Sequence, residues 1–181
     1  MSNTSGWILL AYRIPSEPTR WRAGVWRRLK GAGAIYLHNS VAILPASPAA
    51  ERLMRSLRSE IVEQMNGSAQ VMGATALAGE SDIVTAFNTA RDDEYAEIVG
   101  RCDDFLTEII SETAAEHFTY GELEENDEDL NKLRGWFEKV AARDTFNAPG
   151  AQPARDALDA CAQSLDEFAN RVYQVDQPIS D

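Results

Sequence analysis

The chain has 181 residues, of which 44% are hydrophobic, and its formal net charge is −12. This length is enough for one sizeable core, or for a compact domain with a helical appendage. No run approaches the roughly 18 apolar residues that cross a bilayer, so we expect a soluble, cytoplasmic protein. Cys102 and Cys161 lie far apart with no CxxC or Cys/His cluster, so neither a disulfide framework nor a zinc site is implied, and we expect two buried thiols.

Positive charge is concentrated at the beginning of the chain. Residues 1–58 contain nine Lys/Arg and two acidic residues, a net charge of about +7, which leaves about −19 for the remainder. Such asymmetry indicates two surfaces with different partners. The positive surface would attract anions, either nucleic-acid phosphates or a small oxyanion.

The first predicted elements are a strand and a basic helix. The apolar run Trp7–Tyr12 reads as a central strand that ends before Pro15. Pro18 suits the first turn of a helix, and apolar residues then recur at helical spacing until Gly31. One side of this helix is apolar and the other is basic, which predicts that the basic side faces solvent.

A hairpin, a second helix and a last strand follow. Two short apolar strands, Ala34–Leu37 and Val41–Leu44, flank a polar turn at residues 38–40. A helix beginning at Pro48 ends at Asn66-Gly67, and a strand covers about Gln70–Ala76. The order strand, helix, strand, strand, helix, strand predicts an α+β fold of residues 1–79, a ferredoxin-like βαββαβ sandwich with its helices on one face of an antiparallel sheet.

Residues 80–181 have the helical period. Three apolar stripes, around residues 95–113, 130–140 and 157–172, predict an antiparallel cluster of about three helices. The run GELEENDED, at residues 121–129, reads as a solvated acidic loop with a helix cap at Asn126 or Asp127. We expect this acidic helical extension to pack on the first domain.

Two motifs carry a resemblance to a known family. The segment RIPSEPTRWRAGVWRRLKGAGAIYLHNSV, residues 13–41, and the segment AFNTARDDEYAEI, residues 86–98, resemble the N-terminal domain of the chromate-resistance protein ChrB. The resemblance spans about two-thirds of the chain and rests on Pro, Trp, Gly and Arg at fixed places. It implies a bacterial regulator of chromate-efflux genes, in which longer members carry a C-terminal domain after this one.

The strand–helix–hairpin part also resembles the ferredoxin-like domain of CRISPR-associated Cas2 proteins and of the phenylacetate repressor PaaX. In Cas2 nucleases the proposed metal ligand is an acidic residue at the end of the first strand. By this resemblance, the corresponding residue in this chain is Arg13. A cation cannot supply the oxygen ligand that Mg²⁺ requires, so nuclease activity is not supported. The winged helix-turn-helix that precedes this domain in PaaX is not found in the sequence.

The candidate binding residues lie in the basic segment. Guanidinium groups offer paired donors that match phosphate and tetrahedral oxyanions. The candidates for binding DNA or an anion are Arg13, Arg20, Arg22, Arg27, Arg28, Lys30, His38 and Ser40. Arg13 and Arg22 are the foremost, because both adjoin apolar positions. Two alternatives stay open: the arginines pair with the acidic half of the chain, and residues 38–40 serve only as a turn.

A second candidate set is structural. Glu17 or Glu94 could bridge to Arg13, Arg22 or Arg91, and we interpret Glu17, Arg91 and Glu94 as an ion-pair network that locks the sandwich to the first long helix. No Ser-His-Asp or Cys-His spacing and no phosphate-binding glycine loop is present. We therefore expect no catalytic residue, metal or cofactor.

The sequence favours a regulatory or binding module of the ChrB type that acts in chromate or oxyanion resistance through its basic face. Its expected partners are DNA, chromate or a related oxyanion, a second copy of the chain and a separately encoded ChrB C-terminal domain, with no membrane. The alternative is a non-enzymatic interaction protein, a homodimer that binds no DNA, since a net charge of about −19 on the helical half would oppose duplex DNA.

Overall fold

The computed structural model describes residues 6–176, and the chain divides into two units, residues 1–90 and 91–181, with the division inside helix α3. Among the described residues there are four strands and five helices. In chain order they are β1 (Trp7–Arg13), α1 (Thr19–Gly31), β2 (Ile35–His38), β3 (Val41–Pro45), α2 (Pro48–Glu63), β4 (Ser68–Ala74), α3 (Glu80–Ala114), α4 (Tyr120–Ala141) and α5 (Ala151–Val175). The predicted mixture of α and β structure is therefore confirmed.

The sheet of the first unit has the strand order β2-β3-β1-β4, and all neighbouring strands are antiparallel. β1 is central, as its apolar run predicts, and Leu10 pairs with Ala42 of β3 and with Val71 of β4. The β2–β3 register shifts between Tyr36 and His38, which is the irregularity expected of a polar insertion between two short strands.

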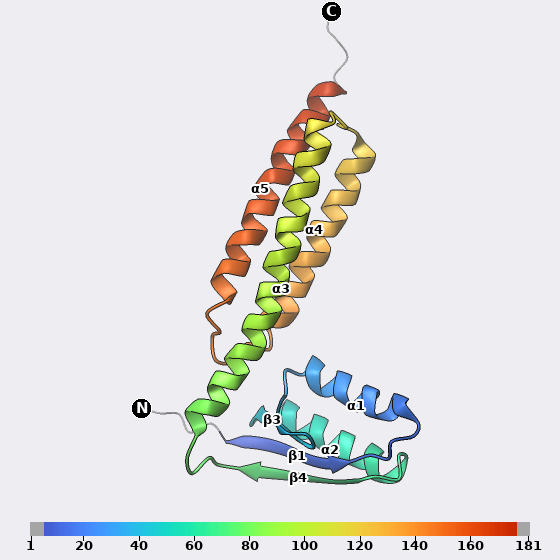
Figure 1. The fold of residues 1–181 in the computed structure, drawn as a ribbon, viewed down its shortest axis with the longest axis vertical. Coiled ribbons are helices and arrows are strands. Elements are labelled where there is room, and N and C mark those ends of the chain that lie inside the picture. Colours follow the sequence, from blue (N-terminus) through green and yellow to red (C-terminus); the bar gives the residue numbers. More distant parts are fainter. Residues whose placement is uncertain (1–5, 177–181) are drawn as a thin grey trace, which may run out of the picture. The chain divides into compact units, whose positions relative to one another are not determined.

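Helices α1 and α2 cover one face of this sheet (Figure 1). Val25 and Leu29 of α1 are buried together with Met54, Leu57 and Ile61 of α2. Their apolar stripes close the core over the side chains of β1, β3 and β4. The opposite side of α1 is left to its cations, as the helical spacing predicts.

The second unit is a cluster of three helices that run in alternating directions (Figure 1). Its core is formed by the buried stripes of all three, including Ile98 of α3, Leu130 of α4 and Leu158 of α5. Cys102 and Cys161 are free thiols buried in this core, and the Cys161 Sγ lies 3.6 Å from the backbone oxygen of Cys102. The predicted three-helix cluster is confirmed.

The prediction of an acidic loop at residues 121–129 was wrong, because this segment is the first part of α4. Thr119 caps the helix, its Oγ1 accepting from the backbone N–H of Glu122 at 3.2 Å. The buried stripe of α4 runs through Leu123, Asn126 and Leu130 at helical spacing. The polar Asn126 occupies a core position, and this interrupted the apolar period in the sequence.

Within residues 6–176, none of the helices combines the length and the apolar character needed to cross a membrane. The longest, α3, has 35 residues, and it carries acidic side chains along its length.

Candidate anion-binding cleft

A cleft of about 460 Å³ opens in the first unit beside the end of β1. Four segments contribute to it: the end of β1, helix α1, strand β2 and the turn between β2 and β3. The lining residues are Tyr12, Arg13, Ile14, Arg22, Trp26, Tyr36, Asn39 and Ser40. The set contains two arginines and no acidic residue, so the cleft carries positive charge.

Arg13 is held at the rim of the cleft by its backbone. It is the last residue of β1 and pairs with Ser68 of β4. The chain turns beside it at Gly67, where a Cβ atom would collide with the backbone oxygen of Arg13 and lie 2.7 Å from Cγ2 of Ile61. The Arg13 side chain is exposed, and among the described residues it makes no hydrogen bond or ion pair. Its donors are therefore available to a ligand.

Arg22 and Trp26 approach the cleft from α1, where a spacing of four residues puts them on the same side of the helix. The Arg22 Nη2 donates to the backbone oxygen of Ser16 at 3.1 Å, which ties the guanidinium to the loop before the helix. A guanidinium has five N–H donors, so this bond leaves most of them free. Trp26 is 46% exposed, so part of its ring is accessible from solvent.

Two tyrosines meet at the wall of the cleft. The hydroxyl groups of Tyr12 and Tyr36 lie 2.8 Å apart, and either can be the donor. Burial, together with the hydrogen bond shared with Tyr12, raises the pKa of Tyr36 far above its ordinary value. The Tyr36 hydroxyl is therefore neutral at physiological pH, and whichever hydroxyl of the pair accepts keeps its own hydrogen for another acceptor.

The turn between β2 and β3 supplies Asn39 and Ser40. The backbone N–H of Tyr12 donates to the backbone oxygen of Ser40 at 2.9 Å, so the turn is fastened to β1 next to the cleft. His38, which the sequence also suggested, is exposed and is not among the lining residues.

The other predicted cations of the basic helix lie outside the cleft. The Arg28 Nη1 lies 2.6 Å from Oε2 and 2.7 Å from Oε1 of Glu60, on α2. The hydrogen bond from Arg28 lowers the pKa of Glu60. The Arg27 Nε donates to the backbone oxygen of Ala23, the Lys30 Nζ lies 5.1 Å from the centroid of the Trp26 ring, and Arg20 is exposed. Arg13, Arg22 and Ser40 are thus the predicted residues that the fold brings together.

Of the predicted ion-pair residues, Arg91 and Glu94 lie together in the second unit, whereas Glu17 lies on the exposed loop before α1. The Arg91 Nε is 3.1 Å from Oε2 of Glu94, and the Arg143 Nη2 is 3.2 Å from Oε1 of the same carboxylate. Arg91 is only 3% exposed. Burial lowers the pKa of Arg91, and the charge of Glu94 opposes that shift. The Arg91–Glu94 contact lacks hydrogen-bond geometry, so the pairing is chiefly one of charge.

The motif around Arg91 fastens α3 to the connection between α4 and α5. Asp92 accepts from the backbone N–H of Gly150 at 2.7 Å, and the Tyr95 hydroxyl donates to Asp144 at 3.2 Å. A Cβ atom at Gly150 would lie 2.8 Å from the Asp92 carboxylate, so a larger residue there would have to displace this carboxylate. In this unit residues 91–95, with the sequence RDDEY, have a structural role.

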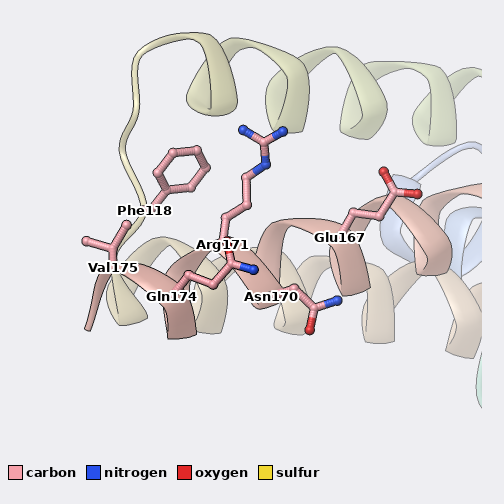
Figure 2. A pocket seen from close by; sticks show the side chains of 6 residues that line it. All are labelled: Phe118, Glu167, Asn170, Arg171, Gln174 and Val175. Carbon is pink, nitrogen blue, oxygen red and sulfur yellow. The ribbon is translucent and has the colours of Figure 1, made fainter. Parts of the chain in front are cut away.

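A hollow of about 510 Å³ lies at the end of α5 and contains none of the predicted residues (Figure 2). Its lining comes from one side of α5 and from Phe118, which precedes α4. The guanidinium carbon of Arg171 lies 5.7 Å from the centroid of the Phe118 ring, so this cation already has an aromatic partner.

Sequence reasoning did not find Tyr12 and Tyr36 as residues of the cleft. Both read as ordinary strand residues, and only the antiparallel pairing of β1 with β3 and of β3 with β2 brings the two hydroxyls together. A weak signal exists, since each tyrosine lies within four residues of a predicted site residue, Arg13 or Ser40.

Comparison with known proteins identifies the family. The family model described as "Protein ChrB, N-terminal" matches residues 22–179, nearly the whole chain. The chain therefore belongs to this family, as the resemblance of its two motifs predicted. No curated protein and no solved structure matches it.

Proposed function

We propose that the chain is a regulatory binding module and that its cleft holds an anionic group through Arg13 and Arg22. Membership of the ChrB N-terminal family implies a role in chromate resistance or in its regulation. The observation that supports the proposal is the convergence of two arginines from separate elements in a cleft with no acidic residue. The anionic group would belong either to an oxyanion such as chromate or to a phosphate of DNA.

The chemistry of the cleft suits such a group. Arg13 and most of the Arg22 donors have no partner among the described residues, so binding an anion there would break few existing bonds. Hydrogen bonds between a guanidinium and an oxyanion are charge-assisted and roughly twice as strong as neutral ones. Ser40 and Asn39 can add neutral donors from the turn.

A ferredoxin-like arrangement is part of this proposal. The element order βαββαβ and the strand order β2-β3-β1-β4 both support it. We also propose that the function is not enzymatic. Ser40 is the only serine among the lining residues. The lining contains neither a histidine nor a carboxylate that could act as a general base for it.

The test compares two double variants with the same loss of charge. Arg13→Ala with Arg22→Ala changes the cleft, whereas Arg52→Ala with Arg58→Ala removes two exposed cations of α2 that have no partner among residues 6–176. Affinity for chromate would be measured by calorimetry. Affinity for a DNA duplex, taken from the region upstream of the gene that encodes this chain, would be measured by fluorescence at two salt concentrations.

We expect the cleft variant to lose at least about tenfold in affinity for one of the two ligands. The α2 variant should retain chromate binding. Any loss of its affinity for the duplex should be smaller than the loss in the cleft variant, and this difference from the wild type should shrink as salt is added. Equal losses in both variants would mean that net charge alone attracts the ligand, and this result would contradict a role for the cleft.

A second candidate function, self-association, is favoured by the edge strand β4. Its sequence SAQVMGA has no charged residue and no proline, and Met72 is 44% exposed. Edge strands that must stay unpaired are usually protected by charged residues or proline, and β4 has neither. If β4 pairs with a second copy, Met72→Lys should shift the protein from dimer to monomer in sedimentation velocity, and Val62→Lys on α2 should not. A wild-type protein that is monomeric at every concentration would exclude this candidate.

A further inference from the structure

We propose that the cleft takes a nucleotide unit, an aromatic base joined through a sugar to a phosphate. This inference rests on the proposed function, because the phosphate would occupy the anion position at Arg13 and Arg22. The unit could belong to a free nucleotide or to an unpaired residue of a nucleic-acid strand, and both present the same chemistry. Three features of the cleft support it: its size, the placement of Trp26 and the neutral polar groups of its wall.

The cleft is larger than a tetrahedral oxyanion requires. Even if each oxygen is given the whole volume of a water molecule in the liquid, about 30 Å³, four oxygens take about 120 Å³. The cavity volume is about 460 Å³, which falls within the range of about 300 to 1,000 Å³ typical of small-molecule sites. A bare oxyanion bound at the arginines would leave most of the cleft unfilled.

Trp26 lies where a base could stack while its phosphate reaches Arg22. The two residues are four apart on α1 and both line the cleft, so they are separated by about one helical turn of 5.4 Å. This separation is comparable to that between the base and the phosphate of one nucleotide. Trp26 lines the cleft and is 46% exposed, so part of its indole is accessible to a base, and the Lys30 ammonium lies 5.1 Å from the centroid of the same ring.

The cleft also offers neutral hydrogen-bonding groups, whose chemistry suits a sugar or a base edge. The Tyr12–Tyr36 pair keeps one hydroxyl hydrogen for an external acceptor, and Asn39 presents both a donor and an acceptor. A bare dianion needs donors alone, whereas a nucleotide also needs acceptors. The lining supplies both kinds, and it places the cations together with an exposed aromatic ring.

The experiment titrates the full chain with four probes: inorganic phosphate, adenosine, adenosine 5′-monophosphate and a 5′-phosphorylated single-stranded hexanucleotide. Each is measured by calorimetry on the wild type, on Trp26→Ala and on Val62→Ala. Val62, on α2, is a matched control, since it is an exposed large apolar residue of the same unit outside the cleft. The Arg13→Ala with Arg22→Ala variant completes the set.

We expect the mononucleotide to bind at least about tenfold more tightly than phosphate, and Trp26→Ala to weaken it by about 5- to 150-fold. Val62→Ala should have no effect, and the arginine variant should lose both ligands. If the hexanucleotide binds more tightly than the mononucleotide, the nucleotide unit belongs to a nucleic-acid strand. If the mononucleotide binds more tightly, the ligand is a free nucleotide.

Three results would overturn the inference. If phosphate and the mononucleotide bind equally and Trp26→Ala changes neither, the cleft is an anion site without a base position, and the proposed function survives. If the mononucleotide binds more tightly but is insensitive to Trp26→Ala, the base does not stack on this indole. Absence of all binding, including chromate and duplex DNA, would remove the proposed function as well.

Discussion

The cations of α1 differ in what their side chains contact, and this decides which of them can bind a ligand. Arg22 keeps most of its donors for the cleft, whereas Arg28 is bound to both oxygens of Glu60. Helical spacing in the sequence correctly places Arg28 on the exposed side of its helix. It does not reveal the pairing with Glu60, because the two residues are 32 positions apart and meet only when α1 and α2 pack on the sheet.

Replacement of Arg28 by Ala should leave anion binding by the cleft within about twofold of the wild type, since the charge of Arg28 is already balanced by Glu60. Stability should fall by less than about 1 kcal/mol, because the pair is partly exposed. Calorimetric titration and urea unfolding would measure the two effects. Arg22→Ala is the comparison, and an equal loss of affinity in both single variants would contradict the distinction between these arginines.

Gly67 is the residue on which the position of Arg13 depends. Gly67→Ala should destabilise the protein by about 1 to 3 kcal/mol, because the new methyl group has no room between the backbone of Arg13 and Ile61. Urea unfolding measures this loss. Gly73→Ala is the control on β4, where a Cβ atom would meet nothing within 4 Å, and it should be neutral or stabilising. Similar destabilisation by both would show that the close approach at Gly67 is unimportant.

Among the elements, α4 shows most clearly what the sequence could and could not predict. The helices whose stripes are wholly apolar, such as α2 and α5, were predicted from their spacing, and the predicted stripe at residues 157–172 contains five of the six buried residues of α5. In α4 the stripe contains Asn126, which is 3% exposed and bonds through its Nδ2 to Glu112 of α3 at 2.9 Å and to the backbone of Glu122 at 2.8 Å. A buried polar residue satisfied by tertiary partners leaves no apolar signal in the sequence.

The contact between α3 and α4 should make stability depend on pH. Burial raises the pKa of Glu112, and the neighbouring Glu122 and Glu108 raise it further, against the opposing hydrogen bond from Asn126. A raised pKa in the folded state means that the folded protein binds this proton more tightly. The contribution to stability is therefore complete below about 4.5, the ordinary pKa of a glutamate, and is lost as the pH rises through the raised value.

Replacement of Glu112 by Gln should remove this dependence, because the neutral amide mimics the protonated carboxyl and its oxygen can still accept from Asn126. Urea unfolding between pH 4.5 and neutrality should show a smaller fall in the free energy of unfolding than in the wild type. Glu124→Gln, at an exposed position of α4, is the control. Equal pH profiles for wild type and Glu112→Gln would exclude Glu112 as the source.

At the scale of the whole molecule, the sequence predicted the family, the mixed fold and the charge asymmetry, but not the cleft. The family was accessible because its motifs are long and varied, and the match to residues 22–179 confirmed it. The cleft could not be predicted from the sequence, because its lining comes from segments between Tyr12 and Ser40 that the sheet register and the packing of α1 bring together. That the acidic extension packs on the first domain stays a prediction.

The central claim is that an anion binds in the cleft of the first unit, and the most direct measurement is to record backbone amide NMR shifts while chromate is added. The account predicts that the largest changes occur at the end of β1, at Arg22 to Trp26 and at the β2–β3 turn, and that they disappear when Arg13 and Arg22 are both replaced by Ala. Changes centred on Arg28 and Glu60, or spread over the helices of the second unit, would contradict it.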